Sequence, residues 1–269
     1  MPPRVTPETL ERVLFDSVAL EPDSVRIDEP DWVQVRTPSS NRPNHNAVIV
    51  ARIPEAKVEA KVREVIAEHH DRGARMRWIT GPSSRPSDLS RHLAAAGLEL
   101  IGATLAMAKS VPEGGPSAAD GYGVAGLTLR QMTPDNVEDF VDVTMRGWEQ
   151  DEAFAEALRH IANRSFAPEV PTRSYIADLD GQPVASSHLR LLPGIGYFQG
   201  GAVLPQFRKR GIYRALIQRR FEVLRELGLP TAVVWARAFG SGSICGKVGF
   251  EMICEGDFYE SPAMDGRKS

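Results

Sequence analysis

The sequence predicts a mixed α/β fold in which two similar halves follow one another along the chain. Short β-branched and aromatic runs alternate with segments of helical periodicity, which is typical of mixed sheets covered by helices. The order strand, helix, strand, helix, strand occurs at 46–100 and again at 197–253. Between the halves, a stretch rich in proline, glycine and small residues indicates a flexible linker. We therefore expect a domain at 1–110, a linker at 111–126, a domain at 127–262 and a tail at 263–269.

The composition is that of a globular protein and argues against several classes of function. Of 269 residues, 42% are hydrophobic and 25% are charged, which suits one large core or two modest ones. The net charge of −3 gives no support to a nucleic-acid partner or to binding of an anionic membrane. No apolar run reaches about 18 residues, and the first residues lack a signal-peptide core. We therefore expect a cytoplasmic protein with no membrane partner.

Cysteine and histidine are too sparse for a disulfide framework or a zinc site. Cys245 and Cys254 are the two cysteines, and their spacing is not Cys-x-x-Cys, so a reducing compartment is expected. The six histidines are scattered without the spacing of zinc ligands. We expect no metal.

Helix-start signals and alternating patterns place the elements of the first half. Thr6 followed by Pro7 caps and opens a helix, Pro54 opens a second, and Ser87 caps a third. Gly97 ends the third helix. The expected elements are helices at 6–20, 54–72 and 87–97 and strands at 32–36, 46–53, 76–80 and 98–108.

The second half begins with antiparallel strands and ends with a strand–helix–strand unit. Thr133 followed by Pro134 opens a helix, and Asp180-Gly181 predicts a hairpin turn. The expected elements are strands at 127–132, 174–179, 184–192, 197–204 and 231–235, helices at 133–144, 151–163 and from 212 to about 226, then a short helix and a last strand opening at Gly249-Phe250.

A basic bend between a strand and a helix is the strongest binding signal. Arg208, Lys209 and Arg210 precede Gly211, after which the apolar residues take helical spacing. A helix N-terminus presents unpaired N–H groups and a partial positive charge, and a glycine allows close approach of the backbone, so the bend suits a phosphate. The same residues also fit an ordinary strand-to-helix turn with solvated arginines.

The bend resembles the acyl-CoA-binding motif of the GNAT superfamily of N-acetyltransferases, written V-x-P-x-x-[R/Q]-x-x-G-x-[G/A]. Val203, Pro205, Arg208 and Gly211 stand at the matching positions, whereas Tyr213 replaces the last small residue. The resemblance implies the acyl-CoA N-acyltransferase fold, two GNAT-like halves in tandem, and acetyl-CoA as co-substrate. It also implies that the backbone at 201–203 pairs with pantetheine and that 209–214 hold the pyrophosphate. The residues so assigned to the cofactor are Gly201, Ala202, Val203, Arg208, Lys209, Arg210, Gly211, Ile212, Tyr213, Arg214 and Ser243.

The catalytic residues that the resemblance implies are less well marked. Cys245 stands where many relatives have a tyrosine that protonates the leaving thiolate, but a small buried cysteine is the competing interpretation. His188 lies on a central strand and has an ordinary pKa suited to a general base, although a strand histidine is often structural. Glu149, Glu152 and Glu169 are further candidates for the base.

The first half resembles a degenerate copy of the same domain. Gly97-Leu98 corresponds to Gly249-Phe250, but no Arg-x-x-Gly motif follows Pro54, and Glu55 places a carboxylate where the phosphate would lie. We therefore expect no CoA in this half. A generic α/β accessory domain is the alternative.

The expected function is an N-acetyltransferase in which a primary amine of a small molecule or peptide attacks acetyl-CoA directly in a ternary complex. The alternative is an acyl-CoA sensor without turnover, which the missing tyrosine and Tyr213 favour. Whether the chain forms a homodimer is left open.

Overall fold

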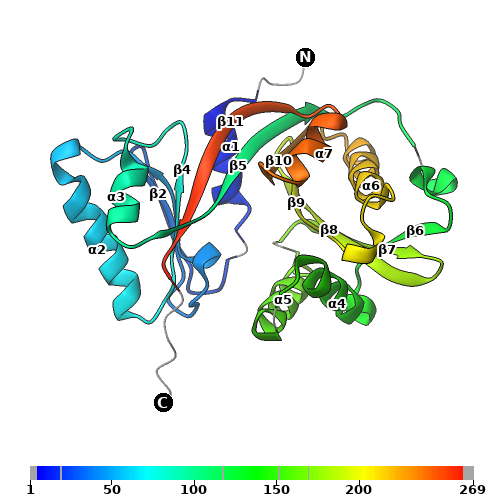
Figure 1. Ribbon diagram of the computed structural model, residues 1–269, viewed down its shortest axis with the longest axis horizontal. Helices are drawn as coiled ribbons and strands as arrows, with labels where there is room; N and C mark the ends of the chain where they lie inside the picture. The colour runs from blue at the N-terminus through cyan, green and yellow to red at the C-terminus, as the bar shows by residue number, and fades with distance from the viewer. Residues whose placement is uncertain (1–4, 19, 117, 151, 169, 263–269) are drawn as a thin grey trace. The chain divides into compact units, whose positions relative to one another are not determined.

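The computed structural model describes residues 5–18, 20–116, 118–150, 152–168 and 170–262 (Figure 1). These residues form two compact units, and each combines strands with helices, which confirms the predicted α/β class. None of the described helices is both long and apolar enough to cross a bilayer. In described residues, the N-terminal unit comprises 5–107, 236–246 and 251–262, and the C-terminal unit comprises 108–235 and 247–250.

The N-terminal unit is a sheet in the order β1-β2-β3-β4-β11-β5. Its core lies between the sheet and α2 and α3, where Trp78 is fully buried with Val62 and Leu93. The bounds are α1 (Pro7–Asp16), β1 (Val25–Glu29), β2 (Trp32–Arg36), η1 (Pro43–His45), β3 (Ala47–Ala51), η2 (Glu55–Lys57), α2 (Val58–Asp71), β4 (Arg77–Thr80), α3 (Leu89–Ala95), β5 (Glu99–Ser110), α7 (Ser241–Lys247) and β11 (Glu251–Glu260).

The last strand of the chain belongs to the N-terminal unit, which differs from the expected domain at 127–262. β11 pairs antiparallel with β4, from Asp257 opposite Thr80 to Glu260 opposite Arg77. Glu260 also accepts hydrogen bonds from the Arg77 guanidinium. The two strands are far apart in the sequence, so their pairing depends on tertiary structure and cannot be predicted from local sequence patterns. The expected tail at 263–269 lies outside the described residues.

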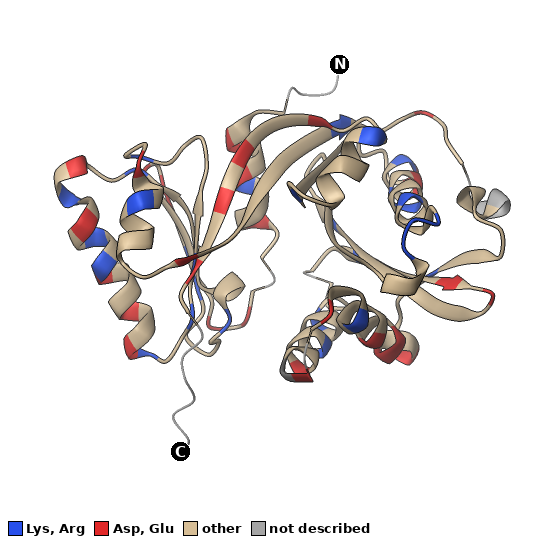
Figure 2. Cartoon of the chain, in the orientation of Figure 1, with Lys and Arg blue, Asp and Glu red and all other residues tan. Residues whose placement is uncertain are grey.

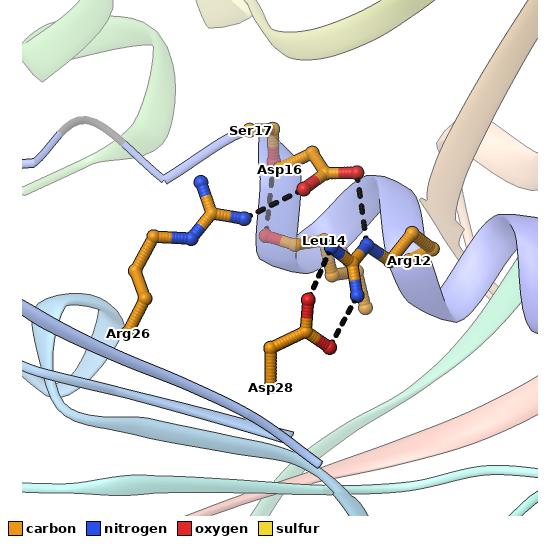
Figure 3. Close-up of polar contacts among 6 residues, drawn as sticks. All are labelled: Arg12, Leu14, Asp16, Ser17, Arg26 and Asp28. Atoms are coloured by element: carbon orange, nitrogen blue, oxygen red, sulfur yellow. Dashed lines mark hydrogen bonds and ion pairs between the residues drawn. The ribbon is translucent and has the colours of Figure 1, made fainter. Parts of the chain in front are cut away.

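Strand β1 was missed because its side chains are mostly exposed and charged. It pairs antiparallel with β2, and its charges are matched by α1. Arg12 donates to both carboxylate oxygens of Asp28, at 2.5 and 2.6 Å, and Arg26 donates to Asp16 at 2.6 Å (Figure 3). Exposed ion pairs of this kind are screened by solvent and contribute little to stability, so backbone pairing with β2 is the main constraint on β1.

The C-terminal unit is a sheet in the order β10-β9-β8-β7-β6 with helices on both faces. α4 and α5 cover one face, and α6 covers the other (Figure 1). The bounds are η3 (Ala118–Gly123), β6 (Leu127–Gln131), η4 (Pro134–Asn136), α4 (Val137–Trp148), α5 (Glu152–Arg164), β7 (Thr172–Leu179), β8 (Gln182–Leu192), β9 (Ile195–Val203), η5 (Pro205–Phe207), α6 (Ile212–Glu226) and β10 (Thr231–Arg237).

Part of the expected linker is folded against α6. Tyr122 is only 6% exposed, and its hydroxyl donates to the Glu222 carboxylate at 2.5 Å. The burial of Tyr122 and its hydrogen bond fix this segment to the unit. The described residues of 111–126 therefore do not form a freely flexible linker. The small residues of this stretch favoured the prediction of a flexible linker, whereas Tyr122 fixes it to α6.

Three phenylalanines form the centre of the C-terminal unit on the α6 side. Phe198 of β9, Phe221 of α6 and Phe250 lie with ring centroids 5.2–5.8 Å apart. Each is at most 4% exposed. Aromatic pairs of this geometry add about 0.5–1.5 kcal/mol beyond the burial of their area.

Replacing Phe221 by alanine should therefore lower the free energy of unfolding by about 3–5 kcal/mol, measured by urea denaturation. Leu227 lies at the end of the same helix and is 48% exposed. Leu227→Ala is the matched control, with an expected change within about 0.5 kcal/mol. Equal losses in the two variants would contradict this view of the core.

Candidate functional site

Strands β9 and β10 are paired over only part of their length. Their parallel register runs from Ile195 opposite Thr231 to Tyr197 opposite Val233. β9 nevertheless continues to Val203, so in the described strands its second half has no β10 partner. An edge of this kind offers unpaired backbone groups to an extended ligand.

A bulge in β9 decides which backbone groups face this edge. The register with β8 shifts at Gly200, which has a φ of 50°. Beyond the bulge, Leu204 donates to the Val184 carbonyl, and alternation then directs Ala202 toward β8. The backbone groups of Gly201 and Val203 therefore point away from β8, toward the unpaired edge.

Both carbonyls on this edge already accept hydrogen bonds from side chains of the same unit. The indole of Trp148 donates to the Gly201 carbonyl at 3.1 Å. Arg208 donates to the Val203 carbonyl at 3.2 Å and to the Gly147 carbonyl at 2.8 Å. A carbonyl has two lone pairs, so these bonds leave capacity on the oxygens and leave the N–H groups of Gly201 and Val203 directed outward.

Gly147 is required where α4 meets β9. A Cβ at this position would lie 2.8 Å from the Cβ of Ala202 and 3.2 Å from the Val203 nitrogen. The last turn of α4 is therefore held against the β9 edge by close backbone approach and by the bonds of Trp148 and Arg208. Neither contact was expected from the sequence, because a glycine and a tryptophan near a helix end give no local signal of their partner.

The basic bend leads directly into α6. Gly211 is its N-cap, with a φ of 87°, and no side chain caps the helix. Lys209 also has a left-handed φ, of 67°. Lys209, Arg210 and Arg214 are exposed, whereas Ile212 is buried and anchors the first turn. Figure 2 shows the basic stretch in blue where the chain enters α6. The N–H groups of the first turn have no partner within the helix, and the three cations flank them along the chain, an arrangement suited to phosphate.

Tyr213, the departure from the family motif, packs against the β9 backbone. A Cβ added at Gly201 would lie 2.6 Å from the Tyr213 ring. The larger side chain is therefore accommodated by a glycine on the neighbouring strand, and the two positions form a matched pair. The aromatic ring borders the edge on the side of the bend.

His188 lies beside the bulge on the α4 face. A Cβ at Gly200 would contact both the His188 and the Trp148 rings at 3.4 Å. The Nδ1 atom of His188 is 2.6 Å from the Ser174 hydroxyl, and its ring meets that of Phe140 with centroids 4.7 Å apart. Burial, followed by the charge of Arg220, lowers the pKa of His188 to about 4.

The low pKa limits the chemistry of His188. Its imidazole is neutral at pH 7 and can accept a hydrogen bond from an amine. A general base works best when its pKa lies near the operating pH, so at a pKa of about 4 His188 is a weak base toward an ammonium group.

The remaining predicted site residues lie elsewhere. Cys245, 1% exposed, and the exposed Ser243 are on α7, which belongs to the N-terminal unit. Glu149 ends α4 in a left-handed conformation, and Glu152 opens α5; both are exposed. Glu169 lies outside the described residues. In the described part of the chain, no group of three or more histidine, cysteine or acidic residues could hold a metal ion.

The corresponding edge in the N-terminal unit is occupied by the chain itself. β3 and β4 pair in parallel only from Ala47 opposite Arg77 to Val48 opposite Trp78. Beyond this register the backbone of Arg85, in the loop after β4, takes the place of a partner strand. The Arg85 N–H donates to the Ala51 carbonyl at 2.9 Å, and the Arg85 carbonyl accepts from the Ile53 N–H at 3.0 Å.

The loop that carries Arg85 is fixed by one part-buried and one buried hydrogen bond. The Arg52 guanidinium donates to the Ser83 carbonyl at 3.2 Å, and the Ser83 N–H donates to Glu11 at 3.1 Å. Glu11 is 1% exposed, and burial raises its pKa. The self-pairing is therefore built into the core of the N-terminal unit.

Comparison with known proteins agrees with this architecture. Residues 135–242 match the model of the acetyltransferase (GNAT) family. No curated protein sequence matches the chain. Several solved structures cover nearly its whole length, including the following three. A conserved, functionally unknown protein from Staphylococcus epidermidis ATCC 12228 has a TM-score of 0.70 at 13% identity, over 90% of this chain and 95% of that one.

The other two structures carry GNAT names. A GCN5-related N-acetyltransferase from Kribbella flavida has a TM-score of 0.67 at 15% identity, over 96% of this chain and 97% of that one. A tandem GNAT protein from the clavulanic acid biosynthesis pathway has a TM-score of 0.59 at 16% identity, over 99% and 91%. At these identities the likeness concerns the fold, and it confirms the predicted acyl-CoA N-acyltransferase fold in tandem.

The environment of His188 has a measurable consequence for stability. Its pKa is about 4 in the folded chain, against an ordinary 6.5, so the unfolded chain binds the proton more readily. The stabilisation is fully present above pH 6.5 and is lost as the pH falls toward 4. Imidazole NMR should show His188 titrating near pH 4, and His188→Gln should flatten the dependence of stability on pH in this window. Titration near pH 6.5 would contradict the loss of solvation to which the lowered pKa is attributed.

Proposed function

From the match of residues 135–242 to the GNAT family model, we propose that the chain is an N-acetyltransferase. Acetyl-CoA would be its co-substrate, and the acceptor would be a primary amine of a small molecule or peptide. The reaction would occur in one ternary complex, by direct attack of the amine on the thioester.

The unpaired edge of β9 beside the basic bend is the observation that carries this proposal. The outward N–H groups of Gly201 and Val203 suit the amide carbonyls of pantetheine, which would lie along β9 like an added strand. The pyrophosphate would then reach the N–H groups of the first turn of α6 and the side chains of Lys209, Arg210 and Arg214. Arg208 would act chiefly by fixing the bend to α4.

In this arrangement most of the catalysis comes from positioning. The diphosphate at the end of β9 and the pantetheine along it would bring the thioester to the Gly200 bulge, where Trp148 and His188 lie. The neutral amine would attack the carbonyl carbon, and the carbon–nitrogen bond would form as the carbon–sulfur bond breaks and the CoA thiolate leaves. The nitrogen would lose one proton to solvent, and the thiolate would take one up to give the free thiol. His188 would accept a hydrogen bond from the amine. Cys245 as the donor to the thiolate remains a prediction.

The N-terminal unit is proposed to carry no CoA. Arg85 already pairs with the part of β3 where pantetheine would bind, and displacing it would also break the contacts of Ser83 with Arg52 and Glu11. The proposed role of the unit is therefore structural.

Amine-dependent release of the CoA thiol tests the function directly. With acetyl-CoA and a panel of amines, amino acids and peptides, the protein should release free thiol only when an acceptor is present. Gly211→Asp and Gly211→Asn form a matched pair of nearly equal size. Both face the same left-handed φ, and only aspartate adds charge near the phosphates, so its CoA affinity should fall by roughly 100-fold relative to asparagine.

Two results would contradict this account. Equal CoA affinity in the aspartate and asparagine variants would remove the bend as the phosphate site. Tight acetyl-CoA binding with no thiol release from any amine would instead favour the acyl-CoA sensor.

Calorimetry provides the test of the N-terminal unit. Titration of the full chain with CoA should give one site per chain, and the Gly211→Asp variant should lose it. A second site that persists in this variant would show that the Arg85 segment yields to the cofactor.

A further inference from the structure

Arg190 of β8 is a buried cation that has no charged partner among the residues the structure describes. Its side chain is 7% exposed, and its one hydrogen bond runs to the Thr172 hydroxyl at 3.2 Å. Its Nε atom has no partner among the described residues, and no acidic group there forms an ion pair with it. Two other arginines of this unit do have acidic partners: Arg130 binds Asp178, and Arg219 binds Glu222.

An unmatched guanidinium in the interior is energetically unfavourable. Burial removes water from the charge, and lost solvation is recovered only when an anion or several acceptors replace the water. Burial lowers the pKa of Arg190, but arginine remains charged at any ordinary pH. The fold therefore maintains a positive charge that the described residues do not neutralise.

Arg190 lies on the face of the sheet that carries the proposed reaction. Side chains two residues apart on a strand share a face, so Arg190 is on the same side as His188, which contacts α4 through Phe140. Across the strands it stands opposite Thr172 and Tyr197. The exposed Gln199 and half-buried His188 leave this face accessible beside it.

The direction of β9 places Arg190 on the acceptor side. The basic bend follows the end of β9, so the thioester would lie back along the strand, near Gly200. The amine must then approach from beyond the bulge, toward the beginning of β9. Tyr197, opposite Arg190, is three residues before Gly200, or about 10 Å along the strand.

We infer that Arg190 binds an oxyanion of the acceptor, so that the acceptor is an amine carrying a carboxylate or phosphate a few bonds from its nitrogen. The guanidinium suits both groups because it presents parallel N–H donors. This inference rests on the proposed function for the site, but the charge of Arg190 is independent of it.

Matched pairs of amines provide the test with the full chain. β-Alanine, 4-aminobutyrate and phosphoethanolamine are the anionic probes, and β-alaninamide, 4-aminobutanamide and ethanolamine are their neutral counterparts. Thiol release from acetyl-CoA gives kcat/KM for each, and the shift in Tm gives binding without turnover. The wild type should prefer an anionic member by about 30-fold or more, with carboxylate and phosphate arms showing which oxyanion fits.

Three variants separate binding from a structural role. Arg190→Met should abolish the preference and should unfold at the same or a higher Tm without probes, because it removes an unmatched buried charge. Arg190→Lys should keep part of the preference. Arg173→Met is the control, since Arg173 is exposed on neighbouring β7 and should not affect the preference.

The outcomes divide clearly. The inference is overturned if the wild type uses the anionic and neutral probes equally, or if its preference survives in Arg190→Met. It is also overturned if the anionic probes give no response that depends on Arg190. A large fall in the Tm of Arg190→Met without probes also counts against it, because it would mark a structural cation. If acetyl-CoA fails to bind, the proposed function fails, yet an Arg190-dependent Tm shift with the anionic probes would still support the oxyanion site.

Discussion

The incomplete pairing of β9 with β10 is the constraint on which the rest of the site depends. Three residue pairs join the two strands. Beyond them β9 has no β10 partner in the described strands, and the bulge at Gly200 determines that Gly201 and Val203 face outward. An open edge inside a sheet is unfavourable unless something satisfies it. Trp148 and Arg208 do so in part, by bonding the two carbonyls, and the N–H groups stay available for a ligand.

In both halves two parallel strands pair over only a few residues and leave an unpaired edge, but the two edges differ in what lies beside them. In the N-terminal unit, parallel strands also separate after a short register, and the chain closes the edge with its own Arg85. In the C-terminal unit, the edge is bordered by α4, Tyr213 and a cationic helix N-terminus. One copy has thus become a packed support, whereas the other retains the features of a binding site. β11, the last strand, completes the sheet of the first copy.

Local patterns predicted much of this structure, because caps, turns and periodicity are properties of neighbouring residues. The α6 bend and the repeated element order were visible for that reason. β1 was missed since its side chains are solvated, and the place of β11 depends on a distant partner. The environment of His188 and the isolation of Arg190 follow from side chains brought together by folding, so neither could be predicted from the sequence.

Hydrogen exchange of individual amides along β9 tests the central claim most directly. Ala202 is paired with β8, so its N–H should exchange slowly with or without CoA. The N–H groups of Gly201 and Val203 face the open edge, and the account predicts that they exchange fast in the free protein and become protected when CoA is added. Unchanged exchange at both positions in a CoA-saturated sample would show that the cofactor does not lie along this strand.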